Sequence, residues 1–449
     1  MKEKKMLRFN CTHESETAAK YVCGHLLGTR EADYHQAFTG DARIYRLACP
    51  ACAKETEIGA IPWQTVCDAC FAETEAENCW DGIRGRPEVK EEPSDIAFTH
   101  RMAALPGDSF GPLRLVQPIL ASAGSLWIGL TIAGALVQMD LDMRTLQHIT
   151  DVSASDVDLS QPMSLVCSPD GAFLCLTQTL GTVGVVIERS SGHRTFWLQR
   201  GDYHSDISPF SAAFVVRDER TLLIHATDWN RLDISDPATG ELLTERSPTS
   251  YEDGEDVPPH YLDYFHGRLV LSPSRESVVD DGWVWHPFGV VRTWNVRRWL
   301  DENVWESEAG TTVRDLVCRA YFWGGPLCWV DDDTLAVWGY GDDDDCLIPA
   351  VRLFNTLTGE ELGWFPGPEV ASDDNRQWRD KIADFGGRLF FDQYLFAVSE
   401  KFGVSVWDYR KGMRLHADPS FVPIVYHPVT REFLTILPDG NLQLSRLTT

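Results

Sequence analysis

The N-terminal part of the chain concentrates side chains that bind metal ions. Seven of the 12 cysteines lie within the first 79 residues, and four of these form two Cys-x-x-Cys pairs, Cys49/Cys52 and Cys67/Cys70. A Cys-x-x-Cys turn presents two thiolates to one tetrahedral Zn²⁺, and two such turns complete a Cys₄ set. The 14 residues between the pairs are close to the spacing of zinc ribbons. We therefore predict a structural zinc site at these four cysteines.

Two Cys-x-His pairs precede them, Cys11/His13 and Cys23/His25, with nine residues between the pairs. Each pair places a thiolate and an imidazole within reach of one ion, so together they predict a Cys₂His₂ site. We expect the chain to hold one or two structural zinc ions.

The pairing of these ligands stays open between two arrangements. A sequential arrangement joins the first two pairs in one site and the last two in another. A cross-braced arrangement joins the first pair with the third and the second with the fourth. Short loops favour the sequential form, because closing a small loop costs less entropy. His35 and Cys79 are alternative ligands.

A catalytic or redox role for these cysteines is disfavoured. A catalytic zinc site keeps one position open for water and has a nearby Glu base, whereas a complete Cys₄ set is available here. His13-Glu14 lacks the second His of a zincin motif, and neither Cys-x-x-Cys pair is expected to open a helix in a βαβ unit. The chain has no Gly-x-Ser-x-Gly elbow, phosphate loop or dinucleotide fingerprint. We therefore expect no enzymatic activity.

Three segments, 21–27, 48–52 and 66–71, resemble a cysteine-rich module of bacterial proteins. The shared pattern is Cys-x-His-Leu, then Cys-x-x-Cys, then Cys-x-x-Cys followed by an aromatic residue. The resemblance implies a bacterial source and a structural metal site, and it implies no reaction. Cys11 and His13 lie outside this pattern.

The elements that follow are short β-strands in a degenerate repeat. In the clearest copy, a turn at Ser168-Pro-Asp-Gly171 joins two alternating strands, and a third strand ends at Glu188 before a Ser-Gly turn. The steps between equivalent positions are 48, 48, 59, 60, 53 and 37 residues, which fit one four-stranded blade with loop insertions. These positions are Asp140, Glu188, Asp236, Asn295, Asn355, Asp408 and Ser445.

Residues 113–449 resemble the WD40 family, most plainly at Ser168-Pro-Asp-Gly171 and Trp407-Asp408. The resemblance implies an all-β fold, a seven-bladed β-propeller preceded by a small zinc-ribbon-like module, with six or eight blades as alternatives. The last repeat contains only three strands. We expect the strand-like segment Leu113–Ala121 to pair with its outer edge and close the ring.

Composition suggests three regions: a zinc-binding module at 1–80, a linker at 81–112 rich in Gly, Pro and charge, and the propeller at 113–449. The net charge is −27, of which residues 1–90 carry −2 (12 basic minus 14 acidic) and the rest −25 (28 minus 53). A field of this sign repels phosphate backbones and anionic lipids, so we expect neither nucleic acid nor membrane as a partner.

The N-terminus lacks the apolar core of a signal peptide, which favours a cytoplasmic protein without disulfides. Val116–Met139 contains no charged residue and is long enough to cross a bilayer. Its Gly, Ser and Gln residues favour a hairpin of two buried strands, Leu126–Ile132 and Ala135–Leu141.

Four long loops, 251–259, 280–285, 299–310 and 342–345, are acidic, and several carry Trp. Carboxylates beside exposed aromatic rings suit Lys/Arg-rich partners, whereas the alternative is solvated loop tips with Trp packed between blades. The run Asp342–Asp345 lacks the ligand plan of a calcium loop. The candidate partner-binding residues are Asp253, Asp256, Trp283, Trp285, Asp343 and Asp344.

These patterns favour a non-enzymatic scaffold, in which the acidic loops of the propeller bind a protein partner with a basic surface and zinc stabilises the N-terminal module. The alternative is an enzyme or small-molecule sensor with a site in the central channel of the propeller, because this fold hosts both kinds of function.

Overall fold

The computed structural model describes residues 20–37, 46–52, 61–84, 88–92, 94–103, 111–121, 124–247, 251, 254, 256–285, 287–341, 344, 347–370 and 384–448. The chain divides into two compact units, one made of residues 1–89 with 340–348 and the other of residues 90–339 with 349–449. The N-terminal metal ligands belong to the first unit and the repeats to the second.

The first unit contains a five-stranded mixed sheet in the order β4-β1-β3-β2-β5 and one helix. Strand β1 pairs antiparallel with β4 and parallel with β3, and β2 pairs parallel with β5. This unit is therefore a sheet with a helix, larger than a zinc ribbon alone. Its elements are β1 (Lys20–Cys23), β2 (Asp33–Ala37), β3 (Arg46–Ala48), β4 (Trp63–Val66), α1 (Asp68–Glu77) and β5 (Cys79–Arg84).

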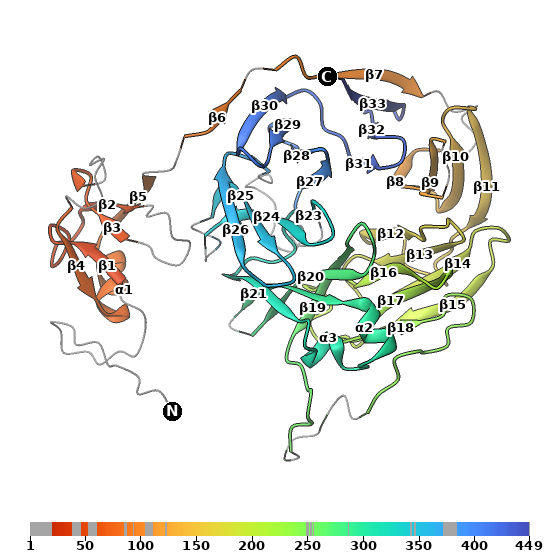
Figure 1. Cartoon of the computed structure of the whole chain (residues 1–449), viewed down its shortest axis with the longest axis horizontal. Coiled ribbons are helices and arrows are strands. Elements are labelled where there is room, and N and C mark those ends of the chain that lie inside the picture. The colour runs from red at the N-terminus through yellow and green to blue at the C-terminus, as the bar shows by residue number, and fades with distance from the viewer. Residues whose placement is uncertain are drawn as a thin grey trace. The chain divides into compact units, whose positions relative to one another are not determined.

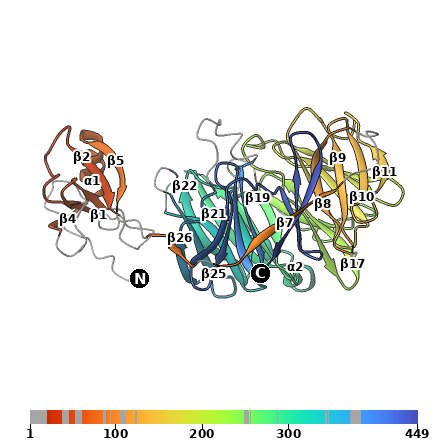
Figure 2. The same ribbon diagram turned by 90° about the horizontal axis from the view of Figure 1, so that it is seen from above.

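In the described residues the second unit contains seven sheets of three to five strands, and consecutive strands pair antiparallel. Figure 1 shows these sheets side by side around a common centre, and Figure 2 shows them turned by 90°. The first sheet consists of β8 (Leu113–Pro118), β9 (Leu126–Thr131), β10 (Ala135–Asp140) and β11 (Thr145–Asp151). The second consists of β12 (Met163–Cys167), β13 (Phe173–Gln178), β14 (Val183–Glu188) and β15 (Arg194–Gln199). The third consists of β16 (Ala212–Arg217), β17 (Arg220–Asp228) and β18 (Arg231–Ser235).

The other four sheets complete the unit, two of them with a strand from the beginning of the chain. The fourth sheet consists of β19 (Phe265–Leu271), β20 (Ser277–Val284), β21 (Phe288–Asn295) and β22 (Arg314–Ala320), and the fifth of β23 (Leu327–Trp329), β24 (Thr334–Tyr340), β25 (Ile348–Asn355) and β26 (Glu361–Pro366). The sixth consists of β27 (Gly387–Asp392), β28 (Tyr394–Ser399), β29 (Gly403–Asp408), β30 (Met413–Asp418) and β6 (Lys90–Glu91). The seventh consists of β31 (Val425–His427), β32 (Glu432–Ile436), β33 (Leu442–Thr448) and β7 (Ala97–Ala103).

The first strands of neighbouring sheets face the centre. Strand β12 packs against both β8 and β16, β16 against β19, β23 against β27, and β31 against β8. The middle strands lie between adjacent sheets and are apolar on both faces, as in Val185–Ile187, whose side chains have no exposed surface. Radially arranged sheets of this kind, each running outward from a central strand, form a β-propeller.

The predicted repeat is confirmed at the level of single residues, because six of its seven anchor positions lie at or directly after the end of the third strand of a sheet. The side chain of Asp140 explains why. Its Oδ1 accepts hydrogen bonds from the amides of Asp142 and Met143, at 3.0 and 2.9 Å. Asn355 and Asp408 accept from the amides two and three residues later in the same way. A short acceptor at this position thus fixes these three turns.

The segment that closes the ring differs from the prediction. Leu113–Pro118 is the inner strand of the first sheet, where it pairs with β9. The three strands of the last sheet are instead completed by β7, which comes from the predicted linker and pairs antiparallel with β33 from Ala97↔Thr448 to Ala103↔Leu442. Both views place β7 beside the C-terminal strand. The expected pairing of the two sheet edges is therefore present, with a different strand.

Two other expectations concern the loops and the uncharged segment. The predicted loop 299–310 contains two short helices, α2 (Val296–Asp301) and α3 (Glu306–Ala309), and Trp299 is fully buried there. Val116–Met139 supplies parts of β8 and β10 and all of β9, and the predicted hairpin is confirmed by the antiparallel pairing of β9 with β10. None of the helices in the described residues has the length and apolar character of a membrane span.

Candidate metal centre and interaction surface

The register of β1 and β3 brings two cysteines together. These strands run parallel with Tyr21 opposite Arg46 and Val22 opposite Leu47, so their carboxyl ends meet at the same edge of the sheet. Cys23 is the last residue of β1, and Cys49 directly follows β3. The amide of Cys49 donates a hydrogen bond to Cys23 Sγ at 3.2 Å.

Two further ligands come from the turns that follow these strands. His25 Nδ1 lies 3.3 Å from Cys52 Sγ and 3.8 Å from Cys49 Sγ. The ligand atoms of Cys23, His25, Cys49 and Cys52 all lie within 4.8 Å of one another. Ligand atoms around a tetrahedral Zn²⁺ with bonds of about 2.3 Å would lie roughly 3.8 Å apart. Three sulfurs and one imidazole nitrogen at this spacing fit one zinc ion without an open position.

The group lies at the edge of the small core of this unit. Cys23 and Cys52 are buried, Cys49 is partly buried and His25 is exposed. The turn that carries His25 is held by hydrogen bonds from Gly24 N to Pro62 O and from Leu26 N to Cys23 O, at 2.8 and 2.9 Å. The packing around it comes from buried Val22, Leu26, Leu47, Ile61 and Phe71.

Crowding of the thiols changes their acidity. Burial raises the pKa of Cys23, and burial together with the neighbouring Cys49 raises the pKa of Cys52 to about 12. Burial also acts to raise the pKa of Cys49, but hydrogen bonds from Cys52 outweigh it and lower that pKa. Without a cation, therefore, two of the three sulfurs resist ionisation. A bound divalent ion reverses this preference, because a coordinated thiol is deprotonated.

The ligand pairing differs from both predicted arrangements. The group joins the second Cys-x-His pair with the first Cys-x-x-Cys pair, whereas the sequential and cross-braced forms each separate them. Loop length does not decide which ligands meet, because the parallel pairing of β1 with β3 places the ends of these two strands side by side, whatever the length of the chain between them.

Cys67 and Cys70 lie outside this group, at the start of a helix. Cys67 follows β4 and is the N-cap of α1, where its Sγ accepts a hydrogen bond from Cys70 N at 3.4 Å. This Cys-x-x-Cys pair therefore opens a helix, which connects β4 to β5 at the opposite edge of the sheet. Cys11 and His13 lie outside the described residues. His35 is buried in β2 opposite Ala48, apart from the group.

The cysteines of the second unit follow the sequence interpretation in part. Cys175 and Cys328 are buried in strands, and burial raises the pKa of both thiols. Cys167 is partly buried and Cys318 is exposed, and Cys346 lies outside the described residues. Cys175 and Cys328 therefore behave as small apolar side chains.

A cluster of aromatic rings reaches the surface of the second unit. We define the aromatic patch as Tyr203, His204, Trp229 and Trp285. Tyr203 and Trp285 are 47% and 42% exposed, with ring centroids 6.3 Å apart. His204 contacts both, at centroid distances of 4.5 and 4.8 Å. Tyr203 also contacts Trp229 at 5.3 Å. Exposed rings held in contact form a rigid platform.

Trp283 supports this patch from below. It is 1% exposed and stacks on Phe265 with ring centroids 3.9 Å apart and on Trp323 at 5.1 Å. Its Nε1 donates to Ser208 Oγ at 3.0 Å. Trp283 therefore packs in the interior, whereas its neighbour Trp285 offers its ring to solvent.

Acidic residues adjoin the patch along the chain. Asp202 and Asp206 are exposed on either side of Tyr203 in the chain. Tyr261 lies close enough to Asp263, Asp228 and Tyr203 for their charges to act on its phenol. Burial, followed by the Asp263 carboxylate, raises the pKa of Tyr261. Asp228 also accepts a hydrogen bond from Trp229 N at 2.8 Å, so acidic residues lie next to part of the aromatic patch.

The other predicted partner-binding residues are Asp253, Asp256, Asp343 and Asp344. Asp256 and Asp344 are exposed, while Asp253 and Asp343 lie outside the described residues. Sequence reasoning missed Tyr203 and His204, although Gly201-Asp-Tyr-His204 has the composition of an exposed loop with aromatic residues. That signal is weak because it contains only four residues.

Comparisons with known proteins find only distant similarity. No protein-family model matches the chain, and no curated protein matches it. Among solved structures, it is similar to a chain of the mitotic checkpoint complex, with 14% identity, 80% of this chain and 96% of that chain covered, and a TM-score of 0.46.

Two further solved structures show similar values. The Myceliophteria thermophila Cps50 (Swd1) β-propeller domain shares 11% identity over 77% of this chain and 99% of that chain, with a TM-score of 0.47. BamB from Moraxella catarrhalis shares 15% identity over 72% of this chain and 80% of that chain, with a TM-score of 0.41. These values describe a distant likeness and assign neither a family nor a function.

Proposed function

We propose that this protein is a cytoplasmic, non-enzymatic scaffold. Its seven sheets are the blades of a seven-bladed WD40-like propeller, and residues 1–80 form a module with structural zinc. The propeller binds a protein partner with a basic surface. The observation that carries the proposal is the aromatic patch with its carboxylates, because flat exposed rings beside negative charge recognise Lys and Arg side chains.

The patch has the features of a binding hot spot. The rings of Tyr203 and Trp285 both contact His204, which holds them in place. Little side-chain entropy would therefore be lost when a partner binds. The long-range field of an acidic propeller would accelerate the encounter with a basic partner. Salt would weaken the association by screening this field.

Zinc has a structural role in this proposal. Cys23, His25, Cys49 and Cys52 would satisfy all four positions of a tetrahedral ion, which leaves none for substrate or water. Such an ion ties the end of β1 to the turn after β3. A second ion, which the sequence predicts as the upper number, would draw on Cys67 and Cys70.

Titration of the full-length chain with Lys/Arg-rich peptides tests the partner. We expect binding that weakens with salt and falls at least tenfold in Trp285→Ala and in Tyr203→Ala, because truncated hot-spot aromatics cost about 2 kcal/mol or more. Trp197→Ala is the matched control, since Trp197 is 59% exposed and lies in β15, outside the patch. Equal affinity in all three variants would contradict the proposal.

Elemental analysis of purified protein tests the metal separately. We expect one or two zinc ions per chain and the loss of one in Cys52→Ser. Cys318→Ser, in β22 of the second unit, should keep the full content. A Cys52→Ser variant that retains all of its zinc would show that this group does not bind the ion.

A further inference from the structure

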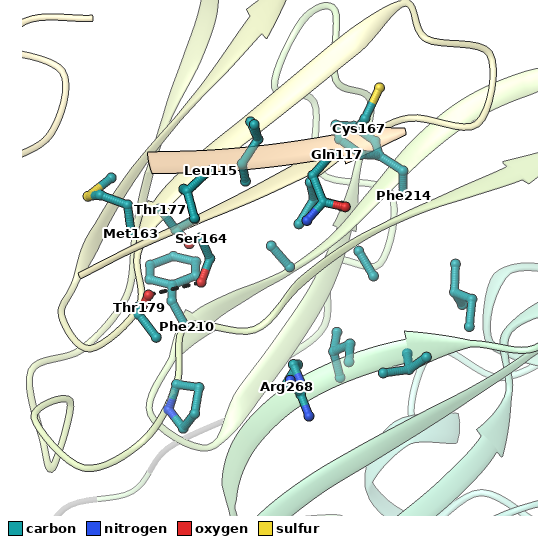
Figure 3. A pocket seen from close by; sticks show the side chains of 18 of the residues that line it. Leu115, Gln117, Met163, Ser164, Cys167, Thr177, Thr179, Phe210, Phe214 and Arg268 are labelled. Atoms are coloured by element: carbon teal, nitrogen blue, oxygen red, sulfur yellow. Dashed lines mark hydrogen bonds between the residues drawn. The ribbon is translucent and has the colours of Figure 1, made fainter. Parts of the chain in front are cut away.

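A cavity lies between the inner strands of the second unit. It encloses about 500 Å³, and β8, β12, β16 and β19 supply most of its wall (Figure 3). Volumes of this size accommodate small organic molecules. Four consecutive sheets supply these strands, and the lining also includes Gly324, Asp384 and Phe385.

The wall is polar and apolar in nearly equal parts, and its charged residues are Arg268, Arg275 and Asp384. Ser164 and Thr179 lie on the wall with their hydroxyl oxygens 3.0 Å apart (Figure 3). Gln117 contributes an amide. The apolar part of the wall includes Leu115, Leu165, Phe210, Phe214 and Leu269. A lining of this kind suits a ligand with a hydrocarbon body and one polar end.

Arg268 brings a positive charge to this cavity. It belongs to β19, and its side chain lines the cavity (Figure 3). Its Nη2 donates a hydrogen bond to the carbonyl of Gly325 at 3.3 Å. Among the described residues, no carboxylate lies within the 4 Å of an ion pair with Arg268. A guanidinium has five N–H donors, so most of those of Arg268 remain for a ligand or water.

Two carboxylates act on Arg268 by their charge, and one of them, Asp384, also lines the cavity. Asp281 accepts a hydrogen bond from Gly325 N at 2.9 Å and lies 3.8 Å from Arg319. Asp384 accepts from the amide of Gly386 at 3.0 Å and lies 3.8 Å from Arg388. Both act on Arg268 by their charge without holding its guanidinium. Arg268 is an exposed residue on the cavity wall, so its guanidinium is accessible to a ligand.

We propose that the cavity binds a small organic carboxylate, with its carboxylate on Arg268 and its apolar body against the walls from β8, β12 and β16. The planar guanidinium matches a carboxylate with two parallel hydrogen bonds. The apolar side chains favour this class over inorganic phosphate, which has no hydrocarbon part to place against them. This site is independent of the partner surface, so either can exist without the other.

Isothermal titration of the full-length protein with benzoate, hexanoate and inorganic phosphate tests the inference. We expect the two carboxylates to bind and phosphate to bind much more weakly. Arg268→Gln keeps a donor for Gly325 but removes the charge, and it should weaken carboxylate binding at least tenfold. Arg268→Lys should give an intermediate affinity, because it retains the charge without the planar pair of donors.

Controls separate the site from general electrostatics and from misfolding. Arg297→Gln removes a guanidinium that is 57% exposed, outside the cavity, and should leave binding unchanged. Thermal unfolding would show that both Arg268 variants remain folded. Three results would overturn the inference: no carboxylate binding up to millimolar concentration, equal binding in Arg268→Gln, or tighter binding of phosphate than of hexanoate.

Discussion

A buried carboxylate next to the cavity should make the stability of the propeller depend on pH. Asp281 lies in β20 and is 2% exposed. Burial raises its pKa from the ordinary 3.8 to about 6, although Arg319 and Arg268 act in the opposite direction. Asp281→Asn keeps an acceptor for the amide of Gly325 and removes the titration, so it isolates the effect of this one proton.

The sign of the effect follows from the direction of the pKa change. The folded protein binds this proton more tightly than the unfolded chain does, so the proton stabilises the fold at low pH. That stabilisation is lost as pH rises from about 4 through about 6. A pKa change of this size corresponds to at most roughly 3 kcal/mol, of which about 1.5 kcal/mol falls between pH 5 and 7.5.

Urea unfolding of wild type and Asp281→Asn at pH 5 and at pH 7.5 measures this difference. We expect the variant to gain about 1.5 kcal/mol relative to wild type at the higher pH. Asp218→Asn is the control, because Asp218 is 77% exposed and Asn tolerates its positive φ of 49°. A difference between Asp281→Asn and wild type that is the same at both pH values would refute the reasoning.

Two further predictions concern the ring. The rings of Phe98 in β7 and Phe421 have centroids 4.8 Å apart. Phe98→Ala should therefore lower the free energy of unfolding in urea by about 2 kcal/mol, whereas Met102→Ala, at an exposed position of the same strand, should lower it by less than about 0.5 kcal/mol. Equal losses would mean that β7 does not hold the ring closed. Gly403 has a φ of +73°, and a Cβ there would lie 2.1 Å from a backbone oxygen. Gly403→Ala should therefore lose roughly 2 kcal/mol more than Gly440→Ala, whose Cβ would meet nothing within 4 Å, and equal melting temperatures for the two would contradict this.

Strand positions were predictable because they depend on neighbours in sequence. The Ser168-Pro-Asp-Gly171 turn and the acceptors at Asp140 and Asp408 form hydrogen bonds within a few residues, so their types alone indicate where strands end. The buried runs of the middle strands add a second local signal. The repeat could therefore be found without any knowledge of which sheets touch.

The ligand set could be predicted only as a list of candidates. Cys23, His25, Cys49 and Cys52 were all recognised by type, but which of them meet depends on the parallel register of β1 with β3. No local pattern encodes that register. The closing strand was missed for a similar reason: most of β7 is exposed, so Ala97–Ala103 lacks the alternation of apolar residues that marks other strands.

Pairing of β7 with β33 also has a consequence for the order of folding during synthesis. The side chains of His100 and Ser445 meet at 2.8 Å although 345 positions separate them in the chain. A growing polypeptide exposes β7 long before β33 has been synthesised. Until β33 emerges from the ribosome, β7 presents an open strand edge, so the last sheet cannot form early in synthesis.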